Sequence, residues 1–168
     1  MTDFTALVQG ARRSVRRLAE RKPGDAVKPL VEHVVLAIAR LGVAIELDPA
    51  LRGRADVAPL VDELQTAVRL TSVHLGSYPL DVVADYARVW QGGELQQASW
   101  LRSGLQFFTA LIAGTPAADA LPDLPQALDD LDDHLRRWAQ REGGAPLAEP
   151  GIPRSHWWWH FPEARHTP

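Results

Sequence analysis

The sequence predicts an all-α protein: an antiparallel helical bundle of five to six helices with an extended Trp-rich C-terminal tail. Along nearly the whole chain, apolar residues recur every three or four positions, which is the period of an amphipathic helix. No segment shows sustained two-residue alternation between turn signals, so no sheet is expected. Short connections between the predicted helices favour antiparallel neighbours.

The first predicted helix begins after Asp3, which is positioned as an N-cap, and it ends before Pro23-Gly24. Its apolar stripe consists of Phe4, Leu7, Val8, Ala11, Val15 and Leu18. Its opposite face carries six basic residues, which are Arg12, Arg13, Arg16, Arg17, Arg21 and Lys22. The helix is therefore expected to bury one side and to present a strongly basic one.

The second predicted helix is apolar around almost its full circumference, and Asp25 is placed to cap it. Two sets of apolar residues produce this pattern: Val27, Leu30, Val34, Leu41 and Ile45 on one side, and Val31, Val35 and Ile38 beside them. A helix of this kind belongs at the centre of a bundle. It ends at Asp48-Pro49, and residues 49–56 form a charged connection with room for one helical turn.

Four further helices complete the predicted bundle. A long helix starts at Val57 and continues to Leu75, a short one follows over residues 80–90, and another extends over residues 94–113. Residues 114–125 are a Pro-rich loop. The last helix, residues 124–141, has aspartates toward its N-terminus and arginines toward its C-terminus, an order that complements the helix dipole.

Length and composition indicate one domain with an appended tail. The chain has 168 residues, of which 46% are hydrophobic, and this suffices for a core. We assign residues 1–141 to the helical bundle, 142–153 to a Pro/Gly linker and 154–168 to an aromatic tail that docks on the bundle or on a sister subunit. Sixteen arginines against two lysines suggest GC-rich bacterial codon usage.

Several classes of protein are excluded or disfavoured by the same composition. The absence of cysteine excludes disulfides and thiolate metal sites, and no apolar run approaches the length of a membrane span. The first residues lack the apolar core of a signal peptide, so a cytoplasmic location is expected. No Gly-rich phosphate loop or GxSxG motif occurs, and no cofactor is predicted.

Charge is distributed unevenly along the chain. The net charge is −3, with +4 on residues 1–54 (10 basic, 6 acidic) and −7 on residues 55–168 (8 basic, 15 acidic). The two parts can attract each other within one chain or between two, and self-association as a homodimer is expected. The whole chain is too acidic for a general nucleic-acid binder.

The tail raises the first question about function, since it contains the run SHWWWH at residues 155–160. Three exposed tryptophans make an adhesive surface, so the preferred interpretation is that Trp157, Trp158 and Trp159 pack into a groove of the bundle or of a sister subunit. A docking motif for another protein, a membrane interface or an aromatic ligand is the second interpretation. A metal site on His156 and His160 is the third, and it lacks a clear third ligand.

The basic face of the first helix supplies a second candidate site. Arg12, Arg13, Arg16 and Arg17 are candidate contacts for an anionic partner. The preferred interpretation is a solvated face whose arginines pair with acidic residues elsewhere in the bundle.

Histidines and one short motif supply the enzymatic alternatives. His33, His74 and His134 lie on three different predicted helices, and their spacing matches no known helical metal motif, so they are interpreted as unrelated. The stretch RLTSVH, residues 69–74, is similar to the R-x4-H signature of HEPN ribonucleases. That resemblance implies a dimeric, metal-independent ribonuclease using Arg69 and His74, although Leu70 replaces the polar residue that usually follows the arginine.

Taken together, these observations favour a small cytoplasmic binding, regulatory or scaffold protein that acts through its helical bundle and its tryptophan tail, and is not an enzyme. The alternative is the HEPN-like ribonuclease or a His-based, metal-dependent helical enzyme.

Overall fold

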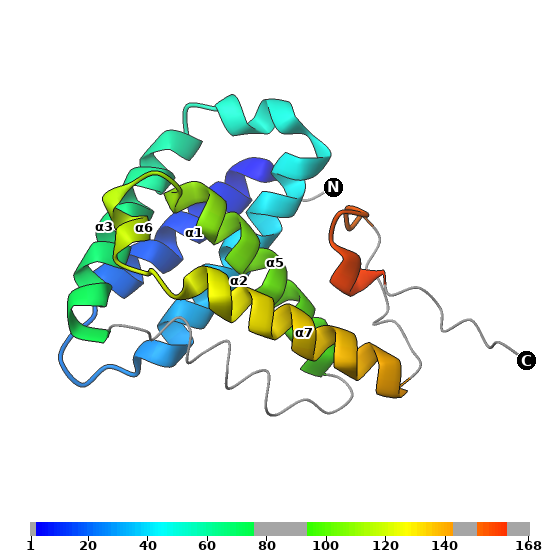
Figure 1. Ribbon diagram of the computed structural model, residues 1–168. Coiled ribbons are helices and arrows are strands. Elements are labelled where there is room, and N and C mark those ends of the chain that lie inside the picture. The colour runs from blue at the N-terminus through cyan, green and yellow to red at the C-terminus, as the bar shows by residue number, and fades with distance from the viewer. Residues whose placement is uncertain (1–2, 76–93, 143–150, 161–168) are drawn as a thin grey trace, which may run out of the picture.

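The computed structural model describes residues 3–75, 94–142 and 151–160, and all of its regular elements within these ranges are helical (Figure 1). They are α1 (Phe4–Ala19), α2 (Val27–Leu47), the 3-10 turn η1 (Pro49–Gly53), α3 (Val57–Leu75), α5 (Glu94–Ile112), α6 (Pro116–Asp119), α7 (Leu124–Glu142) and the 3-10 turn η2 (Trp157–Trp159). The predicted all-α helical bundle is thereby confirmed. The predicted short helix at residues 80–90 lies outside the described residues.

Helix α2 occupies the centre of the bundle, as its nearly continuous apolar surface predicts. It packs on α1 on one side and on α5 on the other, while α1 also packs on α3. Helix α7 lies across α5, and η2 lies beside α7 near the same end of the molecule (Figure 1). Buried apolar side chains from all of these elements form one continuous core.

Two glycines set the distance between α2 and α5. A Cβ atom added to Gly42 on α2 would overlap the ring of Phe107, and one added to Gly104 on α5 would overlap the carbonyl oxygen of Val35. The two helices therefore approach more closely than side chains at these positions would permit. Ser103, which precedes Gly104, and Glu46, one helical turn after Gly42, both contact His156 of the tail.

The predicted helix ends are correct in one case and wrong in another. The Asp3 carboxylate accepts the Thr5 backbone N–H at 3.0 Å and caps α1 as expected. Asp25 does not cap α2, because its carboxylate turns back to accept the backbone N–H of Lys22 at 2.7 Å. Ala26 takes the N-cap position of α2 without a side-chain bond.

Two segments differ in detail from the expected pattern. Within the Pro-rich segment 114–125, Pro116–Asp119 form the short helix α6, with Pro at a first-turn position that needs no N–H partner. In the tail, Trp157–Trp159 form one 3-10 turn and are not extended. None of the helices in the described ranges is both long and apolar enough for a transmembrane span.

Candidate functional site

The C-terminal tryptophans pack against the bundle of the same chain. Trp158 and Trp159 are 1% and 0% exposed, and His156 is also fully buried. Trp157 is half-buried and meets Trp158 edge to face. The contacts come from α2, α5 and α7, so three helices hold the tail.

Ser103 on α5 is the centre of the hydrogen-bond network that holds the tail. Its Oγ accepts the indole N–H groups of Trp158 at 3.0 Å and Trp159 at 3.1 Å. It also lies 3.0 Å from Nδ1 of His156. A hydroxyl has one hydrogen and two lone pairs, so this arrangement is satisfied when Ser103 donates to His156 and accepts from both indoles.

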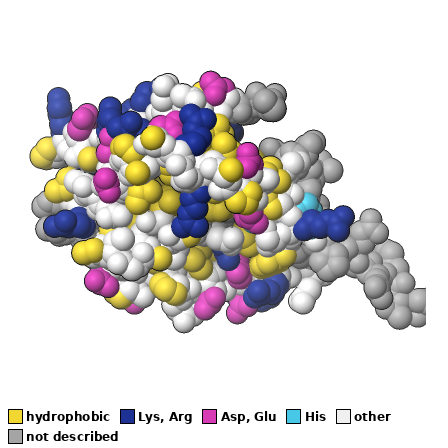
Figure 2. Space-filling model, turned by 90° about the horizontal axis from the view of Figure 1, so that it is seen from above, with side chains coloured by type: hydrophobic (Ala, Val, Ile, Leu, Met, Phe, Trp, Pro, Cys, Tyr) yellow, Lys and Arg dark blue, Asp and Glu magenta, His cyan; other side chains and the backbone are white. Residues whose placement is uncertain are grey.

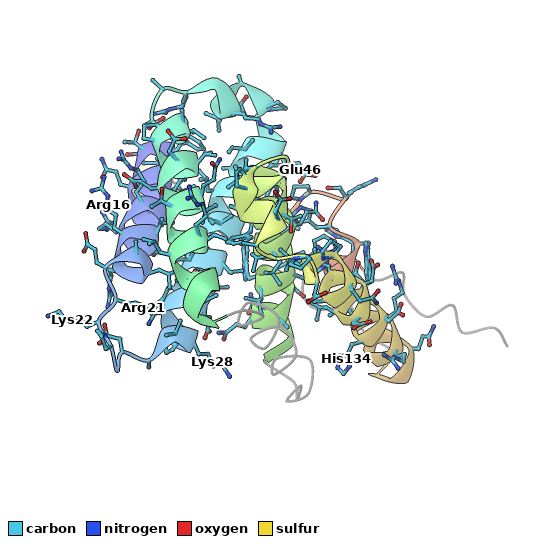
Figure 3. All side chains as sticks on the ribbon, turned by 60° about the vertical axis from the view of Figure 1, so that its left-hand side comes forward. Arg16, Arg21, Lys22, Lys28, Glu46 and His134 are labelled. Carbon is cyan, nitrogen blue, oxygen red and sulfur yellow. The ribbon has the colours of Figure 1, made fainter. Side chains whose placement is uncertain are left out.

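Glu46 on α2 completes this network from the opposite side of the imidazole. Its Oε2 lies 3.0 Å from His156 Nε2, and its Oε1 accepts the hydroxyl of Ser155. Because Nδ1 accepts from Ser103, Nε2 carries the proton and donates to Glu46. Neutral His156 is the form that satisfies both partners. Figure 3 shows Glu46 close to the C-terminal segment and on the opposite side of the molecule from Arg16 and Arg21.

The surroundings of His156 stabilise this neutral form. Burial lowers the pKa of His156 below its ordinary value of 6.5, and Arg102 and His160 lower it further. Glu46 raises the pKa through its charge and hydrogen bond, yet burial is the larger effect. Protonation would also place a third N–H donor against Ser103 Oγ, which has only two lone pairs.

The Ser103–His156–Glu46 series contains the residue types of a nucleophile, a base and an orienting acid. Its geometry gives a different role. Ser103 is 0% exposed, and its oxygen already accepts two indole N–H groups. A nucleophilic serine needs an open path to its oxygen and a free lone pair directed at the substrate, so we interpret this series as a structural connection between the tail and the bundle.

Two arginines add aromatic contacts to the tail. Arg102 on α5 forms a buried, two-point ion pair with Asp132 on α7, at 2.6 and 2.9 Å, and its guanidinium lies 4.2 Å from the centre of the Trp158 ring. Arg136 on α7 lies 4.7 Å from the centre of the Trp157 ring. The ion pair fixes Arg102 in position, so the cation over Trp158 is held in place without ordering a free side chain.

The arrangement gives no support to a metal site on His156 and His160. Both ring nitrogens of His156 face Ser103 and Glu46. Nε2 of His160 has no hydrogen-bond partner among the described residues. In the part of the chain that the structure describes, no three metal-ligating side chains converge.

The basic face of α1 is divided between two neighbours. Arg12 and Arg16 both bind Glu63 on α3, with shortest distances of 2.6 and 2.7 Å. The hydrogen bond from Arg12 is the main cause that lowers the pKa of Glu63 to about 2. Arg12 and Arg16 thus share one carboxylate partner within the chain, and contact of the four arginines with an anionic partner stays a prediction.

Arg13 and Arg17 lie on the other side of α1 and line an open groove of about 790 Å³. Arg40 on α2 is the third arginine of this groove, and Trp100 on α5 lies beside it. The remaining lining residues are small, apolar or uncharged: Ala6, Leu7, Gly10, Ala11, Ser14, Leu36, Ala37, Gln96 and Gln97. No acidic side chain lines the groove among the residues described. We refer to it as the arginine groove.

Trp100 connects the arginine groove to the tail. Its ring meets Trp159 edge to face, with ring centres 5.2 Å apart, and the guanidinium of Arg40 lies 5.9 Å from its centre. One indole therefore lines the groove and contacts the buried end of the tail. On the face shown in Figure 2, basic and acidic side chains are interspersed with exposed hydrophobic ones.

Among the described residues, no group of three metal-ligating side chains includes His33 or His134. His33 is exposed on α2, and His134 is half-buried on α7. Arg69 is exposed on α3, while the side chain of His74 lies outside the described residues. The HEPN-like alternative thus stays a prediction.

Several residues of the site were missed by the sequence analysis. Glu46, Ser103 and Arg102 are polar residues of apolar helices. Ser103 and Arg102 are buried and Glu46 is half-buried, so their position among apolar residues was the available signal. Arg40 and Trp100 lie on different helices, and nothing in their sequence spacing connects them with α1.

Comparison with known proteins adds no relative. No protein-family model matches the sequence, and no curated protein or solved structure is significantly similar to the chain.

Proposed function

We propose that this chain is a non-enzymatic binding protein whose site is the arginine groove and whose ligand is anionic. The observation that supports the proposal is the convergence of Arg13, Arg17 and Arg40, from two helices, on one groove that no acidic side chain of the described residues lines. Like charges repel each other, so three guanidinium groups around one concavity favour a counter-ion between them. Arg12 and Arg16 show the contrast, because both bind the carboxylate of Glu63 within the chain.

The C-terminal tail has a supporting role in this proposal. With Trp158 and Trp159 buried, the tail supports the wall of the arginine groove through Trp100. A cytoplasmic location, a bacterial source, a protein partner and self-association remain predictions from the sequence.

Calorimetric titration with inorganic pyrophosphate at low salt tests the proposal. We expect binding that weakens as salt is added, since screening reduces charge attraction. The triple variant Arg13→Gln, Arg17→Gln, Arg40→Gln should bind at least tenfold more weakly. Arg16→Gln is the matched control, since it removes an arginine of the same helix that faces Glu63 instead. Failure of the intact chain to bind pyrophosphate, or equal losses in the control and the triple variant, would contradict the proposal.

A further inference from the structure

We infer that the ligand of the arginine groove is a nucleoside phosphate, a molecule that joins a flat aromatic ring to a phosphate group. This inference rests on the proposed anion-binding function and goes one step further. It depends on the position of Trp100 relative to the arginines, on the open surface of α1 between them, and on the size of the groove.

The aromatic part of the ligand is assigned to Trp100. Its side chain is half-buried, so one part is held while another part faces the groove. Trp159, which is fully buried, supports it by an edge-to-face contact at 72° between ring planes. A tryptophan held in this way is a preformed stacking surface, and nucleic-acid bases stack on such rings regardless of their sequence. The guanidinium of Arg40 lies over the same ring, 5.9 Å from its centre, and thus adds a flat cation beside the stacking surface.

The phosphate part is assigned to Arg13 and Arg17. They are four residues apart on α1, so both side chains leave the same face of the helix, and both are exposed. Gly10 precedes them on this face, and a Cβ atom placed there would meet only the end of the Arg13 side chain, at 3.9 Å. A ligand can therefore approach the helix surface closely. A guanidinium group donates two parallel hydrogen bonds to two oxygens of one phosphate. A monatomic anion such as chloride has one acceptor atom and does not match this geometry.

The rest of the groove agrees with this ligand in size and polarity. A volume of about 790 Å³ is in the range of pockets for small molecules. Gln97 on α5 lines the groove near Trp100, and its amide nitrogen donates to Glu32 at 2.7 Å, which fixes the amide in place. An amide has both donors and acceptors, so it can pair with the edge of a base as well as with a sugar hydroxyl.

Titration of the full chain with three compounds tests the inference. The compounds are ADP, pyrophosphate and adenosine, under one buffer and salt condition without magnesium. We expect ADP to bind at least tenfold more tightly than pyrophosphate, because stacking adds to the phosphate contacts, and adenosine to bind more weakly than ADP. Trp100→Leu should remove the preference for ADP, so that this variant binds ADP and pyrophosphate with about equal affinity. Leu retains apolar volume against Trp159, and a thermal melt of the variant checks that the fold persists.

The outcomes separate this inference from the proposed function. If pyrophosphate binds as tightly as ADP, the ring is not recognised and the inference is wrong, while anion binding stands. If a single-stranded RNA oligonucleotide of ten residues binds at least a hundredfold more tightly than ADP, the ligand is a polymer and the inference is also wrong. If Trp100→Leu melts at a lower temperature than the parent, the titrations are carried out with Trp100→Phe. A Phe variant that retains the tenfold preference for ADP supports stacking. Loss of that preference in a folded Phe variant overturns it.

Discussion

Substitution of Ser103 by alanine is the sharpest test of how the tail is held. The hydroxyl serves three buried groups: the N–H of Trp158, the N–H of Trp159 and Nδ1 of His156. Ser103→Ala removes their partner and leaves all three in a site that is fully buried. It deletes only one oxygen atom, so loss of packing is a small part of the effect.

The magnitude follows from the number of groups left without a partner. A buried donor or acceptor without its hydrogen bond costs about 1–3 kcal/mol, and neighbouring losses do not add in full, so we expect about 3–5 kcal/mol for Ser103→Ala. Ser99→Ala is the matched control on the same helix. Ser99 donates one bond, to the Trp158 carbonyl at 3.3 Å, and its loss should cost only about 0.5–1.5 kcal/mol.

Urea unfolding, followed by circular dichroism and tryptophan emission, measures both variants. The cost of Ser103→Ala is limited by the free energy of docking the tail, because a tail that is destabilised beyond that value simply detaches. Detachment would shift the emission to longer wavelength while the helical signal remains. A loss of less than about 1 kcal/mol with unchanged emission, or equal losses in both variants, would refute the assigned network.

Two other perturbations test neighbouring features. Gly42→Ala should lower the free energy of unfolding by about 1–3 kcal/mol or more, because its methyl group overlaps the Phe107 ring, and a melt unchanged from the parent would show that α2 and α5 are not in close contact. Acidification should release the tail: the pKa of His156 is lowered on folding, so its stabilisation is complete above the ordinary value of 6.5 and is lost as pH falls below it. Tryptophan emission between pH 7.5 and 5 measures this release. His156→Gln, which does not titrate, should show no such change; if it changes as the parent does, His156 is not its cause.

Most of the fold follows from local pattern. The stripe that begins at Phe4 and the cap at Asp3 predict α1 correctly, since both depend on residues within one or two helical turns. The N-cap prediction is right for Asp3 and wrong for Asp25, and both outcomes depend on which backbone N–H the carboxylate accepts. An aspartate before a helix can accept an N–H from either side, and the turn at Gly24, with φ of 94°, directs its carboxylate to Lys22.

The site depends on contacts that no local pattern contains. Four arginines of α1 look alike in sequence, and only the position of Glu63 on α3 separates Arg12 and Arg16 from Arg13 and Arg17. Periodicity identifies which residues share a face of one helix. It does not identify which helix packs beside that face, and the charge of that neighbour decides whether an arginine has an ion-pair partner within the chain.

The close contact between α2 and α5 is a condition for the docking of the C-terminal tail. The tryptophans bury a large apolar area, but apolar burial alone does not select a particular turn or orientation. The network around His156 supplies the direction, and it requires Glu46 from α2 and Ser103 from α5 at opposite sides of one imidazole. Only helices in close contact present both groups across a single ring. Gly42 and Gly104, which let α2 and α5 approach, are therefore needed for the ordered tail. Their effect on the tail runs through the spacing of the two helices.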